Sequence, residues 1–250
     1  MDKQYEEKYH ELEEKHWWFM ARRHVVLQLV KQLGVSKEAK ILDIGASGGA
    51  LAWHLKEQGY LDLYLVDNSP HAINKCHSRG MVNAFLMDGE APDFAAGSFD
   101  LLIASDCLEH LEHDERALSN WSELLKDGGV AIIFVPAYRF LWSEHDVINQ
   151  HFKRYDKTTL LKKLHAAGFA VLRAGYWNFL LFFPTVLYRL CSRFFTRGKA
   201  QANQLFFTPS WINRVIVSWM KVENKAMRWI TYPFGVSTFA IVKKDSSKKA

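Results

Sequence analysis

Short runs of apolar residues alternate with amphipathic stretches along most of the chain. The apolar runs lie at 41–44, 61–66, 82–86, 97–105, 130–135 and 169–177. Runs of this length, bounded by glycine or polar residues, are typical of strands that are covered on both faces of a parallel sheet. The stretches between them place apolar residues at helical spacing. The pattern predicts an α/β fold with a mostly parallel sheet.

The N-terminal region is expected to be helical in two parts over residues 2–33. The first part is polar, and the second carries an apolar stripe that ends at Gly34; the stripe consists of Val25, Val26, Leu29, Val30 and Leu33. Between the two parts lies 16–23, in which three aromatic residues stand beside two arginines. The aromatic residues are expected to anchor this helical cap on the sheet.

Helix signals follow several of the predicted strands. Gly59 ends a helix over 50–58, and Ser69 with Pro70 forms an N-cap and first position for the next helix. An amphipathic helix is expected over 114–126, and another from Asp156 to Leu164. Each lies between two apolar runs, as βαβ units require.

The closing apolar run is expected to be the last strand and to follow a helical insertion. Residues 178–231 separate the sixth apolar run from the closing one, and this insertion should lie over the active-site edge of the sheet. A membrane span needs about 20 largely apolar residues, and Pro184, Arg189 and Arg193 interrupt this segment. Its helices are expected either to form a lid over an apolar pocket, the favoured interpretation, or to lie on a bilayer.

A single domain of 250 residues is expected, because one α/β core of this length is common. Its predicted parts are a helical cap, a Rossmann-like core, the insertion, the last strand and a basic tail, at 1–36, 37–177, 178–231, 232–244 and 245–250. The whole is predicted to be a seven-stranded, mostly parallel sheet, and the closing run 232–244 resembles the antiparallel last strand of a known family of Rossmann-like folds.

The stretch 40–49 is predicted to form a buried strand that ends in a glycine-rich turn before a helix. Gly45, Gly48 and Gly49 let the backbone turn sharply and bring a ligand close to main-chain N–H groups. Such a turn alone suits nicotinamide, flavin and S-adenosylmethionine (SAM) cofactors equally. Asp67, at the end of the second strand and 24 residues beyond Asp43 (67 − 43), can accept hydrogen bonds from both hydroxyls of a ribose.

The spacing Asp43, Gly45, Ser47, Gly49 resembles the first motif of the class I SAM-dependent methyltransferases, and it lacks the glycine spacing of the dinucleotide fingerprint. The sequence departs from the family at Ser47, where a glycine is usual; serine is small enough to keep the turn. The resemblance is to the enzymes with ubiquinone-type core motifs. It implies SAM as the cofactor, with Ala46 in the same turn and Asn68 beside Asp67.

The resemblance assigns roles to further residues. Asp88 would bind the adenine amine and Gly89 would admit the ring, whereas an ordinary surface Asp-Gly turn is the alternative. Ser105 and Asp106 would line the cofactor pocket. An arginine of the N-terminal cap, Arg22 or Arg23, would bind the methionine carboxylate.

A metal site is a further alternative at the end of the fourth strand. The family signature Leu-Glu-His matches 108–110, and some quinone-pathway methyltransferases hold a divalent metal with acidic, acidic and histidine side chains at this spacing. Asp106, Glu109 and His110 are the corresponding residues. Glu109 and His110 are interpreted instead as hydrogen-bonding groups at a helix start, and no metal is assigned.

The acceptor chemistry is expected in the segment 138–155, which follows the fifth strand. Methyl transfer is an in-line displacement, and a positioned base contributes roughly 10²–10⁴-fold when the acceptor is a hydroxyl. His145 with Asp146 is one candidate base, and His151 is its rival. Arg154 is a candidate for binding an anionic group of the substrate or for a surface ion pair.

Composition and charge limit the kinds of partner that the protein is expected to bind. The net charge is +5 and the isoelectric point is near 9, but no dense basic stripe or nucleic-acid-reading motif is present, so no nucleic-acid partner is expected. Cys76, Cys107 and Cys191 show neither metal nor disulfide spacing, and the charged N-terminus shows no signal segment. A cytoplasmic protein is expected, with peripheral contact to the inner face of the membrane as an open alternative.

The sequence as a whole predicts a SAM-dependent methyltransferase that acts, most readily at oxygen, on a small hydrophobic or lipid-linked acceptor. A non-catalytic SAM-binding protein at the membrane and a nicotinamide-dependent oxidoreductase are the alternatives. The glycine spacing disfavours the oxidoreductase.

Overall fold

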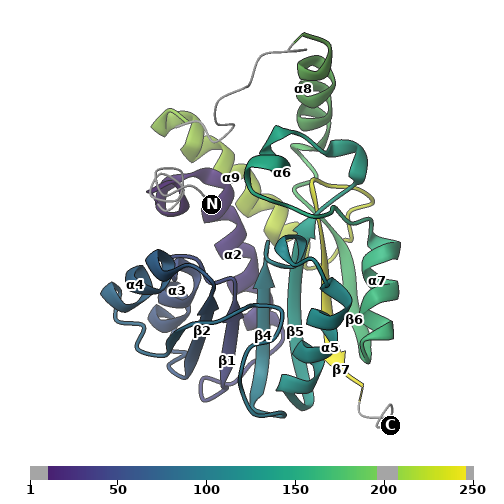
Figure 1. Ribbon diagram of the computed structural model, residues 1–250. Helices are drawn as coiled ribbons and strands as arrows, with labels where there is room; N and C mark the ends of the chain where they lie inside the picture. The colour runs from purple at the N-terminus through teal and green to yellow at the C-terminus, as the bar shows by residue number, and fades with distance from the viewer. Residues whose placement is uncertain (1–10, 196–207, 246–250) are drawn as a thin grey trace.

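A seven-stranded sheet forms the centre of the computed structural model, which describes residues 11–195 and 208–245 (Figure 1). The strand order is β3-β2-β1-β4-β5-β7-β6. The strands are β1 (Ile41–Ile44), β2 (Leu63–Asp67), β3 (Ala84–Leu86), β4 (Phe99–Ser105), β5 (Leu125–Pro136), β6 (Phe169–Trp177) and β7 (Ser237–Lys244). The first five strands are parallel, and β7 runs antiparallel to both β5 and β6, as predicted.

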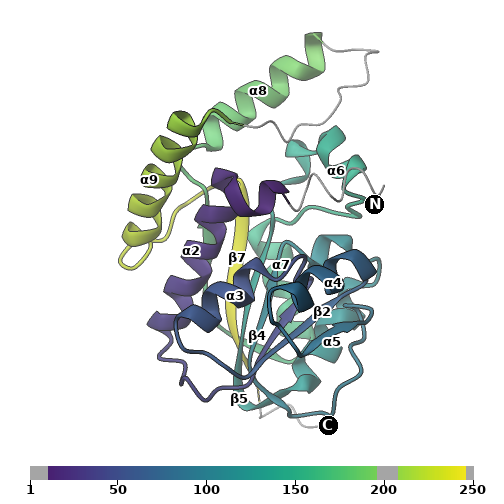
Figure 2. The same cartoon turned by 90° about the vertical axis from the view of Figure 1, so that its left-hand side faces the viewer.

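Helices cover both faces of this sheet (Figure 2). One face carries α2 (Trp17–Gln32), α3 (Ala50–Glu57) and α4 (Pro70–Ser78), and the other carries α5 (Asp114–Leu124) and α7 (Lys157–Ala166). The remaining helical segments are short η1 (Leu108–His110), η2 (Arg139–Leu141) and α6 (Glu144–Ile148), and the two helices of the insertion, α8 (Phe182–Phe195) and α9 (Ser210–Ala226).

The apolar runs form strands because both sides of each central strand are covered. On β4, Leu101 and Ile103 pack into the core under α2 and α3, whereas Leu102 and Ala104 pack into the core under α5 and α7. All four are fully buried. Continuous apolar character, rather than alternation, is what a doubly covered strand requires.

Several element boundaries coincide with the sequence prediction. β6 occupies 169–177 as expected, Ser69 caps α4 through a hydrogen bond from Ala72 N, and Asp156 caps α7 through Thr159 N. Gly168, at φ +80°, follows the end of α7. Local capping chemistry therefore fixed these boundaries.

Three boundaries were predicted wrongly. α2 begins at Trp17, so the aromatic-arginine stretch 16–23 lies in this helix and does not separate two helices; the shorter helical segment at 11–15 precedes it. β5 begins at Leu125. The residues of the expected turn, 127–129, belong to this strand, at the point where its pairing register with β4 shifts. β7 begins at Ser237, not at 232. Residues 1–10 of the predicted cap and 246–250 of the predicted tail lie outside the described residues.

The insertion lies at the carboxyl end of the sheet, with α8 above it and α9 beside α2 (Figure 2). Asn224 of α9 bonds to three groups: its Nδ2 donates to Ala21 O and contacts His24 Nδ1, and its Oδ1 accepts from Trp177 Nε1 at 2.7 Å. Among the helices in 11–195 and 208–245, none combines the length and the apolar character that crossing a bilayer needs.

Candidate active site

A cavity of about 570 Å³ opens where the strand order reverses, at the carboxyl ends of β1 and β4. Open parallel sheets bind ligands at this point, because the loops after the two strands diverge to opposite faces. The cavity is lined by the β1–α3 turn, the N-terminal half of α2, the β4–η1 segment, the segment 136–154 and the insertion helices. It brings together most of the site residues that the sequence predicted.

The β1–α3 turn has the backbone geometry that its sequence predicts. Gly45, Ser47 and Gly49 all have positive φ, at 72°, 50° and 74°. A Cβ on Gly45 would lie 2.8 Å from the Cys107 side chain. Ser47 adopts the left-handed conformation that glycine takes more readily, at a cost of about 1 kcal/mol. The departure from the family motif is therefore tolerated without loss of the turn.

Asp43 supplies a carboxylate at the floor of the cavity. The residue is buried, and its Oδ2 has no hydrogen-bond partner among the described residues. Burial, and after it the neighbouring Glu13 and Asp67 carboxylates, raises its pKa to about 7. A buried acceptor atom without a partner is expected where a ligand supplies the donor. The group fits a cofactor that carries an ammonium.

Asp67 connects the turn to the following strand. Its Oδ2 accepts a hydrogen bond from Ser47 N at 2.9 Å, and its Oδ1 accepts one from Ser69 N at 2.9 Å. A carboxylate at the end of the second strand is suited to bind ribose hydroxyls. Asn68, next in the chain, is exposed. Both residues lie beside the cavity without lining it.

Asp88 and Gly89 lie outside the cavity lining as well. Asp88 is exposed, and its Oδ1 accepts a hydrogen bond from Glu90 N at 2.9 Å, which is the geometry of a local Asx turn. Gly89 O accepts a hydrogen bond from Trp121 Nε1 at 2.8 Å. A Cβ on Gly89 would approach Ile44 to 3.1 Å, so this position is tightly packed. The adenine role of the pair stays a prediction.

Arg22 lies between the two ends of the cavity. Its Nη2 donates to Ser237 Oγ at 2.8 Å and contacts Asp106 Oδ1 at 3.2 Å, and its guanidinium is 4.2 Å from the ring centres of both Phe134 and Trp177. Ser105 and Asp106 line the same wall. The rings fix the guanidinium in place. Arg23 differs, because it donates to the backbone oxygens of residues 13 and 14. Of the two candidates, Arg22 has the rigid placement that carboxylate binding needs.

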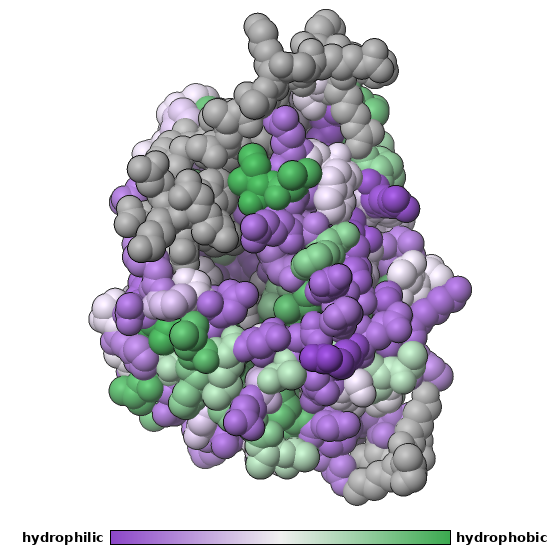
Figure 3. Space-filling view, in the orientation of Figure 1, coloured by the Kyte–Doolittle hydropathy of each residue, from purple (hydrophilic) through white to green (hydrophobic). Residues whose placement is uncertain are grey.

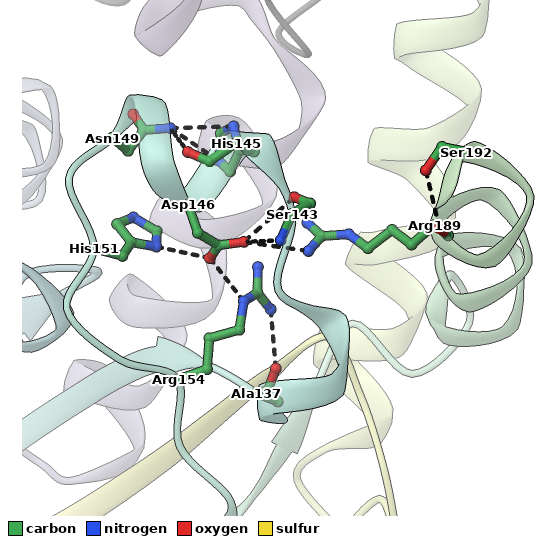
Figure 4. Close-up of polar contacts among 9 residues, drawn as sticks. All are labelled: Ala137, Ser143, His145, Asp146, Asn149, His151, Arg154, Arg189 and Ser192. Carbon is green, nitrogen blue, oxygen red and sulfur yellow. Dashed lines mark hydrogen bonds and ion pairs between the residues drawn. The ribbon is translucent and has the colours of Figure 1, made fainter. Parts of the chain in front are cut away.

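The far wall of the cavity is organised around Asp146, which is fully buried (Figure 4). Its Oδ1 accepts from His151 Nδ1 at 2.9 Å and from Arg154 Nε at 2.7 Å, and its Oδ2 accepts from Ser143 N at 2.8 Å. Arg189 of α8 approaches Oδ2 at 3.5 Å. Burial alone would raise the pKa of Asp146, but the bond from His151 and the charge of Arg154 outweigh it and hold the pKa below its ordinary value.

The expected pairing of Asp146 with its neighbour His145 is not found. The two residues are adjacent on α6 and their side chains diverge, because successive helical positions are about 100° apart. His145 lies against the Asn149 amide at 3.1 Å, and burial lowers its pKa to about 3. His151 takes the carboxylate instead. Both histidines line the cavity.

A third histidine, His110, completes a cluster near the base of the same wall. Its ring centre is 4.6 Å from that of His151, and burial lowers its pKa to about 4. Glu109, His110 and His151 each offer one ligand atom, and these atoms lie within 4.8 Å of one another. Burial raises the pKa of Glu109 well above its ordinary value. His151 thus replaces Asp106 in the set of side chains that the sequence singled out for a metal.

Sequence reasoning missed three residues of the site. Glu13 lies against the glycine turn, where Ser47 Oγ donates to its Oε2 at 3.3 Å. Ser237 holds Arg22, and Arg189 reaches the Asp146 carboxylate from α8. Each comes from an element remote in sequence from its partner. Only the position of Ser237 at the start of the last strand gave a signal, since that strand begins at the cavity edge.

The model of a known protein family, described as a methyltransferase domain, matches residues 17–174. A chloroplastic 2-methyl-6-phytyl-1,4-hydroquinone methyltransferase from Oryza sativa subsp. japonica is 24% identical over 111 residues, which are 43% of this chain and 32% of that protein. A ubiquinone biosynthesis O-methyltransferase from Coxiella burnetii is 27% identical over 152 residues, 56% of this chain and 59% of that protein. The chain thus spans less than two thirds of either relative.

The fold is also similar to that of solved structures. A SAM-dependent methyltransferase from Thermotoga maritima superposes with a TM-score of 0.60 over 96% of this chain and 98% of that one, at 18% identity. At 18% identity, the similarity to this structure shows a shared fold. It includes the sheet and the cavity edge on which the site is built.

Proposed function

The chain belongs to the methyltransferase-domain family, the class I SAM-dependent enzymes, and from this premise we propose that it transfers the SAM methyl group to a hydroxyl oxygen of a small, largely apolar acceptor. One observation carries the proposal: a single cavity runs from the glycine turn at Gly45 to the His151 and Asp146 pair. The cofactor end and the base end therefore belong to one continuous cavity.

The cofactor end has the groups that the amino-acid part of SAM requires. When bound, SAM supplies an electrophilic methyl group on a sulfonium. The Asp43 carboxylate lines the cavity with an acceptor atom to spare, and the Arg22 guanidinium, which lines the same cavity, is held rigidly by its ring contacts. Asp43 is suited to an ammonium and Arg22 to a carboxylate. Together they would orient the cofactor along the cavity.

At the other end, His151 is the better candidate for the general base. Its Nδ1 is bonded to Asp146, which fixes the ring and leaves Nε2 to take the proton of the acceptor hydroxyl. Asp146 stabilises the imidazolium that this transfer forms, and it acts as a positioning residue. His145 has no carboxylate partner of this kind, and a pKa near 3 makes it a poor base at neutral pH.

The walls between the two ends favour an apolar acceptor. Trp17, Phe19, Leu181, Pro184 and Ile216 contribute side chains from α2 and the insertion. The names of the two curated relatives refer to a phytyl hydroquinone and to ubiquinone biosynthesis. An acceptor with a ring hydroxyl and an apolar, lipid-like substituent matches both the walls and the base.

The test is transfer of a labelled methyl group from SAM to short-chain hydroquinones and phenols. His151→Ala is expected to lower the single-turnover rate roughly 10²–10⁴-fold, because it removes the base. Asp146→Asn should lower the rate and shift its pH profile, since the ring loses the partner that stabilises its charged form. His145→Ala is the matched control and should change the rate by less than about tenfold.

Calorimetric titration separates catalysis from cofactor binding. SAM affinity should stay within about twofold in all three variants, because none of these side chains lies at the cofactor end. A larger loss in His145→Ala than in His151→Ala would contradict the assignment of the base. Tight SAM binding by the wild type without transfer to any acceptor would favour the non-catalytic alternative, and binding of NADH in place of SAM would favour the oxidoreductase.

A further inference from the structure

We propose that the outer face of α9, continued by α8, docks the protein on the surface of a bilayer that contains anionic lipid. The proposal goes beyond methyl transfer and does not depend on it. It concerns a surface that lies outside the cavity and that the chemistry above does not use.

The outer face of α9 is a continuous apolar stripe. Trp211, Val215, Trp219 and Val222 follow one another at spacings of four, four and three residues, which places them on one side of the helix. Trp211 is 65% exposed, Trp219 is 58% exposed and Val222 is 68% exposed. Trp229 and Ile230, in the turn after the helix, extend the exposed apolar surface. Large side chains in such a row mark a site of association.

The stripe is not needed to attach α9 to the protein. Val217, Met220 and Asn224 lie on the opposite side of the helix, are buried, and face α2 and the core. Gln28 of α2 adds a hydrogen bond to Asn224 O at 2.6 Å. One side of α9 is therefore fixed to the core, and the apolar stripe is exposed on the other side of this outer helix, whose place beside α2 is seen in Figure 2.

A row of cations runs along one edge of the stripe. Arg214, Lys221 and Lys225 of α9, together with Arg228 just after it, are all exposed. The only acidic residue of the helix is Glu223, which is buried and accepts hydrogen bonds from Phe179 N and Leu180 N. An apolar stripe rich in tryptophan beside an all-cationic edge is the pattern of a helix that lies in the interface of an anionic membrane.

α8 extends this surface at the mouth of the cavity. Phe183, Leu187 and Leu190 are exposed and share one side of the helix, at spacings of four and three residues. The same helix supplies Tyr188 and Arg189 to the cavity lining. α8 lies above the sheet and α9 lies at its edge beside α2 (Figure 2). On the face shown in Figure 3, by contrast, apolar residues form small separate groups among polar ones.

Charge distinguishes the bilayer from a second copy of the chain. A symmetric dimer through this face would bring two rows of cations, without exposed acidic residues on α9, against each other. Anionic headgroups complement the same row, and tryptophan is suited to the headgroup level because its ring is apolar and its N–H is polar. Docking in this orientation would open the cavity toward the lipid phase, from which an apolar acceptor can enter.

The test is flotation of the full chain with two kinds of vesicle, one of phosphatidylcholine alone and one in which about a third of the lipid is phosphatidylglycerol. The wild type should float with the anionic vesicles and bind them at least about tenfold more weakly at high salt. Trp211→Ala with Trp219→Ala should lower the partition coefficient about tenfold or more. Lys221→Glu with Lys225→Glu should lower it by about fivefold for each charge.

Matched controls lie elsewhere on the surface. Trp53→Ala removes an exposed tryptophan from α3, and Lys56→Glu with Lys162→Glu reverses two exposed lysines on α3 and α7. Both should float like the wild type. Failure of the wild type to float with anionic vesicles would overturn the proposal. So would a wild-type dimer in sedimentation that the paired tryptophan variant dissociates, or equal loss of flotation in the controls.

Discussion

Asp43 and Asp146 are both buried carboxylates, Asp43 in the lining of the cavity and Asp146 behind the lining residues His151 and Arg154, and their surroundings give them opposite protonation behaviour. Asp146 is surrounded by donors and cations, so its pKa lies below the ordinary value. Burial, and after it the negative charges of Glu13 and Asp67, raises the pKa of Asp43 to about 7. In the proposed function, the same residue type would hold a base at one end of the cavity and receive a cationic group at the other.

The raised pKa of Asp43 makes the stability of the ligand-free protein depend on pH. Asp43 has a folded pKa of about 7, against an ordinary value of 3.8, so its favourable contribution is complete below about pH 4 and is lost as the pH rises toward 7. The rise corresponds to on the order of 4 kcal/mol. Asp43→Asn cannot lose a proton, so its stability relative to the wild type should increase between these pH values.

Urea unfolding at pH 4 and at pH 8 measures the effect on the free energy of unfolding. Asp100→Asn is the control, because Asp100 lies at the other end of the sheet and its pKa is lowered by Lys126 and Lys40 against the effect of burial. If the free energies of unfolding of Asp43→Asn and the wild type differ by the same amount at pH 4 and at pH 8, the raised pKa of Asp43 is refuted.

Among the elements, the insertion depends on a few polar contacts that join it to α2 and β6. Asn224 is fully buried, and its Oδ1 is the acceptor for Trp177 Nε1 at 2.7 Å. Asn224→Ala should lower the free energy of unfolding by about 1–3 kcal/mol, because it leaves the buried indole N–H without an acceptor. Asn213→Ala, at a half-exposed position where water can replace the lost bonds, should cost less than about 1 kcal/mol. Equal losses in the two variants would contradict this account.

The elements that sequence predicted well are those that local chemistry defines. Apolar runs located the strands, and capping residues such as Ser69 and Asp156 located helix starts. The start of β5 was not predictable, because Asp127 and the glycines after it have the composition of a turn, and only pairing with β4 makes them part of a strand. α2 begins at Trp17 because His16 caps it through Trp18 N, a weak signal in an aromatic stretch.

The site residues, too, could be predicted where a local pattern defines them and not where tertiary packing does. The glycine turn and Asp67 could be located from spacing along the chain, since a βαβ unit fixes their separation. The pairing of Asp146 with His151 and Arg154 could not, because the chain leaves α6 and turns back before His151. The contact from Arg189 joins residues 43 positions apart through tertiary packing. Sequence therefore gave the cofactor end more completely than the base end.

For the molecule as a whole, the proposed cofactor end, the proposed base and the proposed docking surface all lie toward the carboxyl end of the sheet. The β1–α3 turn holds one end of the cavity, the segment 136–154 closes the other, and α8 lies at the mouth (Figure 1). The turn, the segment 136–154 and α8 belong to three different stretches of the chain. Methyl transfer and membrane docking can therefore be tested by separate variants.

The central claim is that the cavity at the β1 and β4 ends binds SAM, and calorimetric titration of SAM into the wild type, Asp67→Asn and Asp100→Asn tests it most directly. The two aspartates are matched, because each accepts a hydrogen bond from a backbone N–H at 2.9 Å at opposite ends of the sheet. We expect saturable binding at one site, weakened at least about tenfold in Asp67→Asn and unchanged in Asp100→Asn. Absence of SAM binding by the wild type, or equal affinity in the two variants, would contradict the account.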